Sequence, residues 1–131
     1  MTLNEIIDQV PDLIAGAGAS EKEIEIAEET LGVKFAKDYK EYLLNYGAIM
    51  FDGHELTGIS KADYLDVVNV TKAQRKYYDD KYAEEMYVLE NLGFDGIVVW
   101  QTSDGVVYET ENGHRKIIAH SLVEYIQIIV D

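Results

Sequence analysis

Apolar residues in the first 47 positions recur every three or four residues, the spacing of amphipathic helices. This spacing is present in three stretches, residues 3–10, 21–31 and 36–46. Ser20 and Glu23 form a capping box, in which each side chain accepts a hydrogen bond from a backbone N–H group left open at a helix start. A glycine, the usual residue at a helix end, directly follows the second and third stretches. The pattern predicts three helices, with residues 16–20 as a flexible link before the second.

After residue 47 the chain changes to short runs rich in β-branched and aromatic residues, which are typical of strands. Ala48–Phe51 and Glu55–Ile59 flank the turn dipeptide Asp52-Gly53 and predict a hairpin. Four more runs, separated by Gly, Asp-Gly and Asn-Gly turn signals, predict an antiparallel meander. These runs are Tyr87–Asn91, Ile97–Gln101, Val106–Glu109 and Lys116–Ala119.

Two further helices accompany these strands. Residues 67–80 carry a weaker helical pattern, and Ser121 with Glu124 forms a second capping box before the apolar C-terminus. Helices, then mostly strands, then one helix is the order of an α+β fold. We expect one domain over residues 1–131, with N-terminal helices packed on a bent, mostly antiparallel sheet of about six strands and a C-terminal helix.

The chain is strongly acidic. Its 25 Asp and Glu residues against 11 Lys and Arg residues give a net charge of −14. Nucleic acid is a poor partner for such a surface, because affinity for it comes mainly from lysines and arginines that neutralise phosphates. The N-terminus lacks a secretory signal, and no apolar run approaches the roughly 20 residues needed to cross a bilayer. We therefore expect a cytoplasmic protein that binds a basic protein, and neither nucleic acid nor membrane.

The acidic charge is concentrated in residues 79–95, where six acids stand against one lysine and tyrosines are interleaved. Tyrosine is favoured at protein interfaces because it buries a large area at small entropy cost. An acidic surface also keeps a protein soluble, and part of the tyrosine cluster is equally compatible with a place in the core. The candidate partner-binding residues of this segment and of the two tyrosines that precede it are Tyr77, Tyr78, Asp79, Asp80, Tyr82, Glu84, Glu85 and Asp95.

The sequence carries no spacing typical of catalysis or metal binding. His54, His114 and His120 are scattered and match no metalloprotease, hydrolase or phosphate-loop motif. Cysteine is absent, which excludes disulfides, thiol nucleophiles and cysteine-based zinc sites. We expect a protein that is not an enzyme and needs no metal or cofactor.

Residues 19–47 resemble the opening of the SUKH superfamily, the Smi/Knr-like proteins. The matching residues are Ser20, Ile24, Glu28, Leu31, Gly32, Phe35, Tyr39, Leu43 and Gly47. The proline usual in this family at the start of the second of these two helices is Ala36 here. Both residues suit a helix start, so the departure is compatible with the fold. Glu28, the acid that matches the family, either binds a partner or orients its helix against a backbone donor.

The resemblance implies an immunity protein, because SUKH proteins are typically encoded beside polymorphic bacterial toxins, many of them nucleases, and neutralise them by binding. An acidic protein suits that role, since it can occupy the basic surface that a nuclease presents to nucleic acid. The alternative is a non-catalytic regulatory scaffold, as in the fungal relatives that act in cell-wall signalling. We expect a monomer or a weak homodimer bound to a cognate toxin domain.

Overall fold

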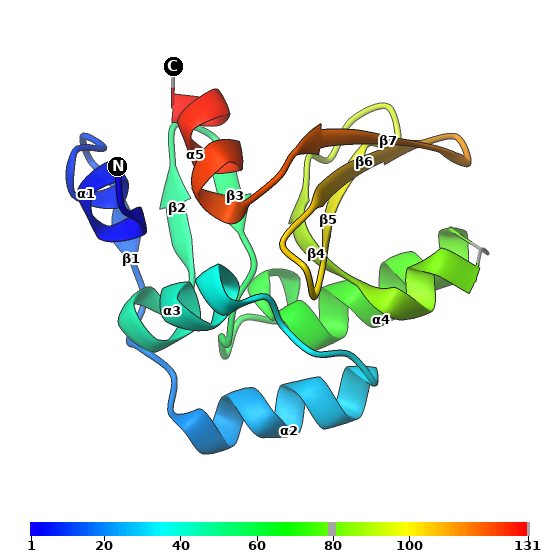
Figure 1. The fold of residues 1–131 in the computed structure, drawn as a ribbon, viewed down its shortest axis with the longest axis horizontal. Coiled ribbons are helices and arrows are strands. Elements are labelled where there is room, and N and C mark those ends of the chain that lie inside the picture. Colours follow the sequence, from blue (N-terminus) through cyan, green and yellow to red (C-terminus); the bar gives the residue numbers. More distant parts are fainter. Residues whose placement is uncertain (79–80, 131) are drawn as a thin grey trace.

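The computed structural model describes residues 1–78 and 81–130, and the described chain has an α+β fold, as predicted (Figure 1). The helices are α1 (Leu3–Asp8), α2 (Glu21–Leu31), α3 (Lys37–Tyr46), α4 (Val67–Tyr77) and α5 (Leu122–Val130), with two short 3-10 helices, η1 (Asp63–Leu65) and η2 (Lys81–Glu85). The strands are β1 (Ile14–Ala15), β2 (Ile49–Phe51), β3 (His54–Leu56), β4 (Met86–Asn91), β5 (Val98–Thr102), β6 (Val107–Glu111) and β7 (His114–Ala119).

These seven strands form two antiparallel sheets, where about six strands in one bent sheet were predicted. The orders are β1-β2-β3 and β4-β5-β6-β7. The predicted hairpin is β2–β3 and the predicted meander is β4–β7, each pair in antiparallel register. The additional strand, β1, has only two residues and pairs with β2. A run that short carries no periodicity, so the sequence pattern missed it.

Local capping decides where the helices begin. Ser20 and Glu23 form the predicted capping box at α2, and Thr2 and Glu5 form another at α1. Gly32 ends α2 with a φ of 70°, in the left-handed region that favours glycine. Half of the predicted second box forms: the hydroxyl of Ser121 accepts the N–H of Glu124, but the carboxylate of Glu124 accepts the N–H of His120 rather than that of Ser121.

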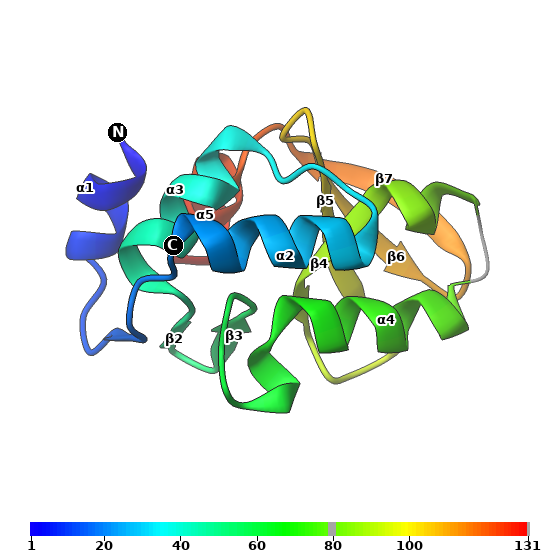
Figure 2. The ribbon, with the colours of Figure 1, turned by 90° about the horizontal axis from the view of Figure 1, so that it is seen from below.

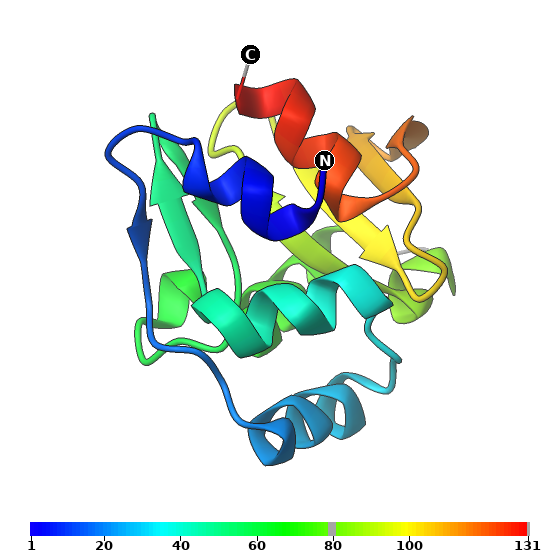
Figure 3. The ribbon, with the colours of Figure 1, turned by 60° about the vertical axis from the view of Figure 1, so that its left-hand side comes forward.

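The helices surround the four-stranded sheet unequally. Figure 2 shows α2 and α4 side by side, and Figure 3 shows α1 beside α5. Tyr87 and Val99 on one face of the sheet belong to the main core, which is shared with α1, α2, α3 and α5. Val98 and Trp100 on the other face pack with Tyr78 in a second, smaller cluster. Because only a few side chains cover this second face, it is the face that carries a groove.

The edge of β4 is covered by polar groups from α4 and from the chain after β3. Thr71 in α4 accepts a hydrogen bond from the N–H of Val88 at 2.9 Å. Thr57 donates its N–H to the carbonyl of Leu89 and its hydroxyl to that of Val88. A buried strand edge needs such partners, since an unpaired backbone group away from water is costly. These contacts fix α4 beside the sheet, and with it the position of the C-terminal end of α4.

Of residues 16–20, expected as a flexible link, residues 16–19 are packed closely against the end of α3. Gly16 donates its N–H to the carbonyl of Ala48, and Ala19 donates to that of Leu43. A Cβ added to Gly18 would lie 2.0 Å from the carbonyl oxygen of Leu44. The small residues of this segment therefore permit a close backbone approach, and flexibility is the wrong interpretation of them.

Candidate partner-binding groove

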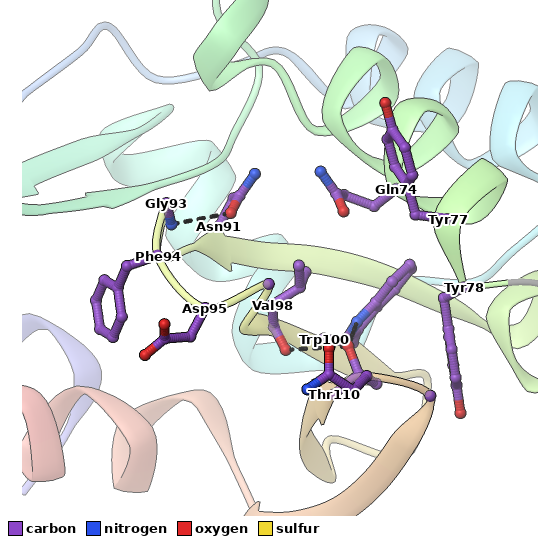
Figure 4. Close-up of a pocket in the computed structure, with 13 residues that line it drawn as sticks. Gln74, Tyr77, Tyr78, Asn91, Gly93, Phe94, Asp95, Val98, Trp100 and Thr110 are labelled. Atoms are coloured by element: carbon purple, nitrogen blue, oxygen red, sulfur yellow. Dashed lines mark hydrogen bonds between the residues drawn. The ribbon is translucent and has the colours of Figure 1, made fainter.

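A groove of about 470 Å³ lies on the second face of the four-stranded sheet (Figure 4). It is bounded by the C-terminal end of α4, the β4–β5 loop, β5 and the β6–β7 turn. Its lining residues are Gln74, Tyr77, Tyr78, Asn91, Gly93, Phe94, Asp95, Gly96, Val98, Trp100, Thr110, Asn112 and Gly113. Three segments that are distant in sequence therefore meet at one concave surface.

Two tight turns shape this groove. Asp95-Gly96 has φ values of 53° and 68°, and Asn112-Gly113 has 51° and 83°. Positive φ at both central residues is the geometry that Asp-Gly and Asn-Gly dipeptides favour in tight hairpin turns. Asn91 also accepts a hydrogen bond from the N–H of Gly93 through its side-chain oxygen, at 3.0 Å. These contacts hold the β4–β5 loop in an arrangement that leaves Phe94 exposed.

The floor of the groove is apolar and its polar groups are already paired. Trp100 is fully buried and donates its indole N–H to the hydroxyl of Thr110 at 2.9 Å. Val98 lies beside it, and the ring of Tyr78 lies 5.8 Å from the indole, measured between ring centroids. Trp100 and Val98 are 0% and 5% exposed, so they close the bottom of the groove, and its accessible surface belongs mainly to the other lining residues.

The rim differs from the floor in being aromatic and rich in amides. Tyr77 is 84% exposed and Phe94 is 59% exposed, although large aromatic side chains usually lie in a core. Gln74 and Asn91 point toward one another from facing sides of the groove (Figure 4). Of the thirteen described residues that line the groove, Asp95 alone carries a charged side chain. Exposed aromatic rings around a concave site are a common arrangement at protein-binding surfaces.

The structure brings together some of the predicted residues and separates others. Tyr77 and Asp95 lie on the groove rim, and Tyr78 is buried beside the floor. Asp79 and Asp80 lie outside the described residues. Partner binding by these residues remains a prediction.

The remaining predicted residues of this segment lie around a neighbouring hollow of about 350 Å³. Tyr82 and Glu85 line it, together with Arg115 from β7. The guanidinium of Arg115 lies 3.8 Å from the ring centroid of Tyr82, which is a cation–π distance. Glu84 is exposed, and its carboxylate lies 3.7 Å from the guanidinium of Arg75. The sequence analysis treated these residues as one surface. In the structure Tyr77, Tyr78 and Asp95 line the groove, whereas Tyr82 and Glu85 line the second hollow.

Arg75 joins several elements beneath these hollows. Its guanidinium donates to the carbonyls of Leu31, Ala83 and Met86, at 2.9, 2.9 and 3.0 Å. Burial lowers the pKa of Arg75 from its ordinary value, and the nearby Glu84 opposes this shift. The arginine therefore ties the end of α2 and the segment after α4 to β4.

Glu28 lines neither hollow, and its carboxylate is held by contacts within the fold. Its side chain is buried in α2, and its carboxylate accepts the N–H of Phe35 at 2.8 Å and lies 3.6 Å from the ammonium group of Lys40. The sequence left two roles open for Glu28, and the hydrogen bond from the N–H of Phe35 corresponds to the one in which Glu28 accepts from a backbone donor. It fixes the connection between α2 and α3.

Sequence reasoning missed Phe94, Trp100 and the groove amides. Phe94 stands between Gly93 and Asp95-Gly96, so it is an aromatic residue inside a turn, where no apolar periodicity accounts for it. That position was a usable signal of exposure. Trp100 carried no such signal, because its strand reads as continuously apolar.

A buried polar cluster lies between β3, β4 and α5. Both carboxylate oxygens of Glu90, at its centre, have hydrogen-bond partners. This carboxylate lies 2.9 Å from the imidazole of His54, accepts the N–H of Glu55 and accepts the hydroxyl of Tyr125 at 2.6 Å. Burial, followed by the charge of Glu90, raises the pKa of Tyr125. A β-bulge in β4 turns Glu90 toward the core, so this cluster joins elements there.

Two further observations concern the described residues only. Within 1–78 and 81–130, no group of three or more His, Asp or Glu side chains is arranged to hold a metal ion. In the same part of the chain, no helix is both long and apolar enough to span a bilayer.

Comparison with known proteins agrees with the fold. A sequence model of the SUKH_5 family, described as SMI1-KNR4 cell-wall, matches residues 3–131. The chain is also similar to the uncharacterized protein YnaB of Bacillus subtilis (strain 168), with 36% identity over 86 residues. Those residues are 65% of this chain and 51% of YnaB, so the match spans about half the length of that relative. With nearly its whole length matched, the chain belongs to the SMI1-KNR4 family of the SUKH superfamily.

Proposed function

We propose that this protein is an immunity protein that binds and neutralises a cognate polymorphic toxin domain, a nuclease, in the cytoplasm. It acts by stoichiometric binding and has no catalytic activity of its own. Family membership supports the class of function, because the SUKH resemblance implies toxin neutralisation. The toxin and the contact residues are parts of the proposal.

The charge of the molecule supports a basic partner. A net charge of −14 steers a basic protein toward the surface and speeds encounter, an effect that falls with ionic strength. A nuclease carries a basic surface because it must bind phosphates. An acidic protein seated on that surface excludes the nucleic acid.

The observation that carries the proposal is the groove with its exposed aromatic rim. Tyr77 and Phe94 expose most of their surface on either side of a cavity that has an apolar floor. Aromatic residues are enriched at the cores of protein interfaces, where a few anchoring side chains supply most of the binding energy. We assign this groove and the adjoining acidic segment to toxin contact.

Co-expression with the product of the neighbouring gene tests this function. The toxin gene alone should stop growth, and co-expression of this chain should restore it. A Phe94→Ala variant should restore growth less well, whereas Tyr64→Ala, at an exposed tyrosine outside both hollows, should behave as the parent. Failure of the parent protein to restore growth against every neighbouring toxin gene would count against the proposal.

A regulatory scaffold is the second candidate, and the description of the matching family as cell-wall favours it. Such a scaffold would bind a cellular protein without neutralising a toxin. Genomic neighbourhood separates the two functions, because a toxin gene beside this one favours immunity and an isolated locus favours regulation.

A further inference from the structure

We propose that the outer edge of β7 binds an extended segment of a partner protein, which adds to the four-stranded sheet as a further strand. The segment that fits this edge alternates carboxylate side chains with branched apolar ones. The inference goes beyond the proposed function, because β7 itself lines no part of the groove and the pairing does not depend on the partner being a toxin.

The outer edge of β7 is open to pairing. β7 is the last strand in the order β4-β5-β6-β7, on the side of the sheet away from α4 (Figure 1). Within residues 1–78 and 81–130, no backbone hydrogen bond joins β7 to a segment other than β6. Every second residue of such a strand directs its N–H and C=O groups away from its neighbour. The opposite edge, that of β4, is by contrast covered by Thr57 and Thr71.

The first four residues of β7 make a regular and accessible edge. Residues 114–117 are all exposed, although a strand usually buries one face. Ile117 is 54% exposed, and an exposed apolar residue on an unpaired edge favours pairing with another chain. The register with β6 is continuous from the Glu111–His114 pair to the Tyr108–Ile117 pair. The β-bulge of this pair of strands lies beyond Ile117, so it does not distort this part of the edge.

The charge on this edge selects an acidic segment. His114, Arg115 and Lys116 are consecutive in a chain that has 11 lysines and arginines and a net charge of −14. Charges farther away than about 8 Å are largely screened at physiological ionic strength, so a strand at this edge interacts mainly with these side chains. Pairing of two copies through β7 would instead bring like charges together. The occupant that fits is therefore an acidic strand from a different protein.

β6 shows the same complementarity on the inner side of β7. Glu109 lies opposite Lys116, with 3.5 Å between its carboxylate and the ammonium group. Tyr108 lies opposite Ile117 in the next pair. The side chains of a strand project to the two faces of the sheet, so they can contact a neighbouring strand on either side. A strand with a carboxylate opposite Lys116 and an apolar side chain opposite Ile117 therefore suits the outer edge as well.

A peptide titration followed by NMR tests this inference. The probe is acetyl-Thr-Val-Glu-Val-Glu-Val-Thr-amide, added to the whole protein while the backbone amide signals are recorded. We expect saturable shifts centred on β7, with a Kd on the order of 1 mM because the short peptide loses its freedom on binding. Amide hydrogen exchange should slow at alternate residues of β7, where the added strand accepts hydrogen bonds.

Two control peptides separate strand pairing from general attraction. With lysine in place of both glutamates, the peptide should bind about fivefold more weakly, because it opposes like charges across the strands. With proline in place of the central valine, it should not bind, because proline lacks an N–H and interrupts a paired strand.

Matched variants locate the site on β7. Lys116→Glu should weaken binding of the acidic peptide by about threefold or more. Lys72→Glu, at an exposed lysine in α4, changes the net charge equally and should leave binding unchanged. Ile117→Thr keeps a β-branched residue in the strand while removing apolar surface, and it should also weaken binding. The amide spectrum of each variant shows directly whether it is folded.

Four results would overturn the assignment of this edge. They are the absence of shifts at peptide concentrations well above the expected Kd, shifts centred on the groove instead of β7, equal binding of the lysine peptide, and equal binding of the proline peptide. None of these results bears on toxin neutralisation, which is tested separately by restored growth.

Discussion

Ala36 shows how one residue can depart from a family pattern for a local reason. Its N–H donates to the hydroxyl of Tyr87 at 2.9 Å, and the same hydroxyl donates to the side-chain oxygen of Gln101. The φ of Ala36 is −61°, which proline could adopt, but proline has no N–H to donate. The buried hydroxyl of Tyr87 therefore accounts for an alanine at a position where proline is usual.

We predict that Ala36→Pro lowers the free energy of unfolding by about 1 kcal/mol, the net value of one hydrogen bond. In a Tyr87→Phe background the same change should cost less, because the accepting hydroxyl is already absent. Urea unfolding of the four proteins in this double-mutant cycle measures the coupling. An equal cost in both backgrounds would show that the hydrogen bond contributes nothing.

Glu28 allows its two proposed roles to be separated by measurement. Removing its carboxylate leaves the buried N–H of Phe35 without its acceptor, so Glu28→Ala should cost about 1–3 kcal/mol of unfolding free energy. Binding of the folded variant to a toxin should remain as in the parent. Weakened binding by a variant of full stability would instead assign Glu28 to the partner interface.

At the scale of elements, the segment before α2 makes a sharp prediction about glycine. A Cβ at Gly18 would lie 2.0 Å from the carbonyl oxygen of Leu44, whereas the nearest contact of a Cβ at Gly16 would be 3.4 Å. Gly18→Ala should therefore cost about 1–3 kcal/mol, as overpacking does. Gly16→Ala should stay within about 0.5 kcal/mol of the parent.

Thermal unfolding of the two glycine variants is sufficient for this comparison. Tolerance of both substitutions would mean that residues 16–19 are the flexible link expected from their composition.

Elements with strong local signals could be predicted from the sequence, and contacts between distant segments could not. The Asp52-Gly53 and Asn112-Gly113 turns and the Ser20 capping box form as predicted, because each depends on a few neighbouring residues. The groove depends on the meeting of the end of α4, the β4–β5 loop and the β6–β7 turn. Tyr77 and Tyr78 are neighbours in the sequence, yet Tyr77 is exposed and Tyr78 is buried, a difference that the sequence pattern could not predict.

The molecule as a whole keeps several tyrosine hydroxyls away from water. Burial raises the pKa of Tyr39, Tyr42, Tyr87 and Tyr125 above the ordinary tyrosine value. The unfolded chain ionises its tyrosines near pH 10 while the folded chain keeps these four protonated. The folded state therefore binds more protons above that pH, and its stability falls as pH rises.

We predict full stability with respect to these tyrosines below about pH 9, and a loss of about 1.4 kcal/mol per pH unit for each of them above about pH 10. The four together should make alkaline unfolding steep and cooperative. Tyrosinate absorbance and circular dichroism, followed together through a pH titration, should change in the same step for the buried tyrosines. Gradual ionisation of all ten tyrosines in a chain that stays folded would contradict this prediction.

The central claim is that this acidic SUKH protein blocks a toxin by occupying its surface, with no turnover. The most direct measurement titrates the purified toxin domain of the neighbouring gene with this protein and follows the toxin's nuclease activity. We predict that activity falls to zero at one equivalent, that added salt weakens the inhibition, and that Phe94→Ala requires an excess. Full nuclease activity in the presence of a large excess of this protein, or loss of activity at far less than one equivalent, would contradict the account.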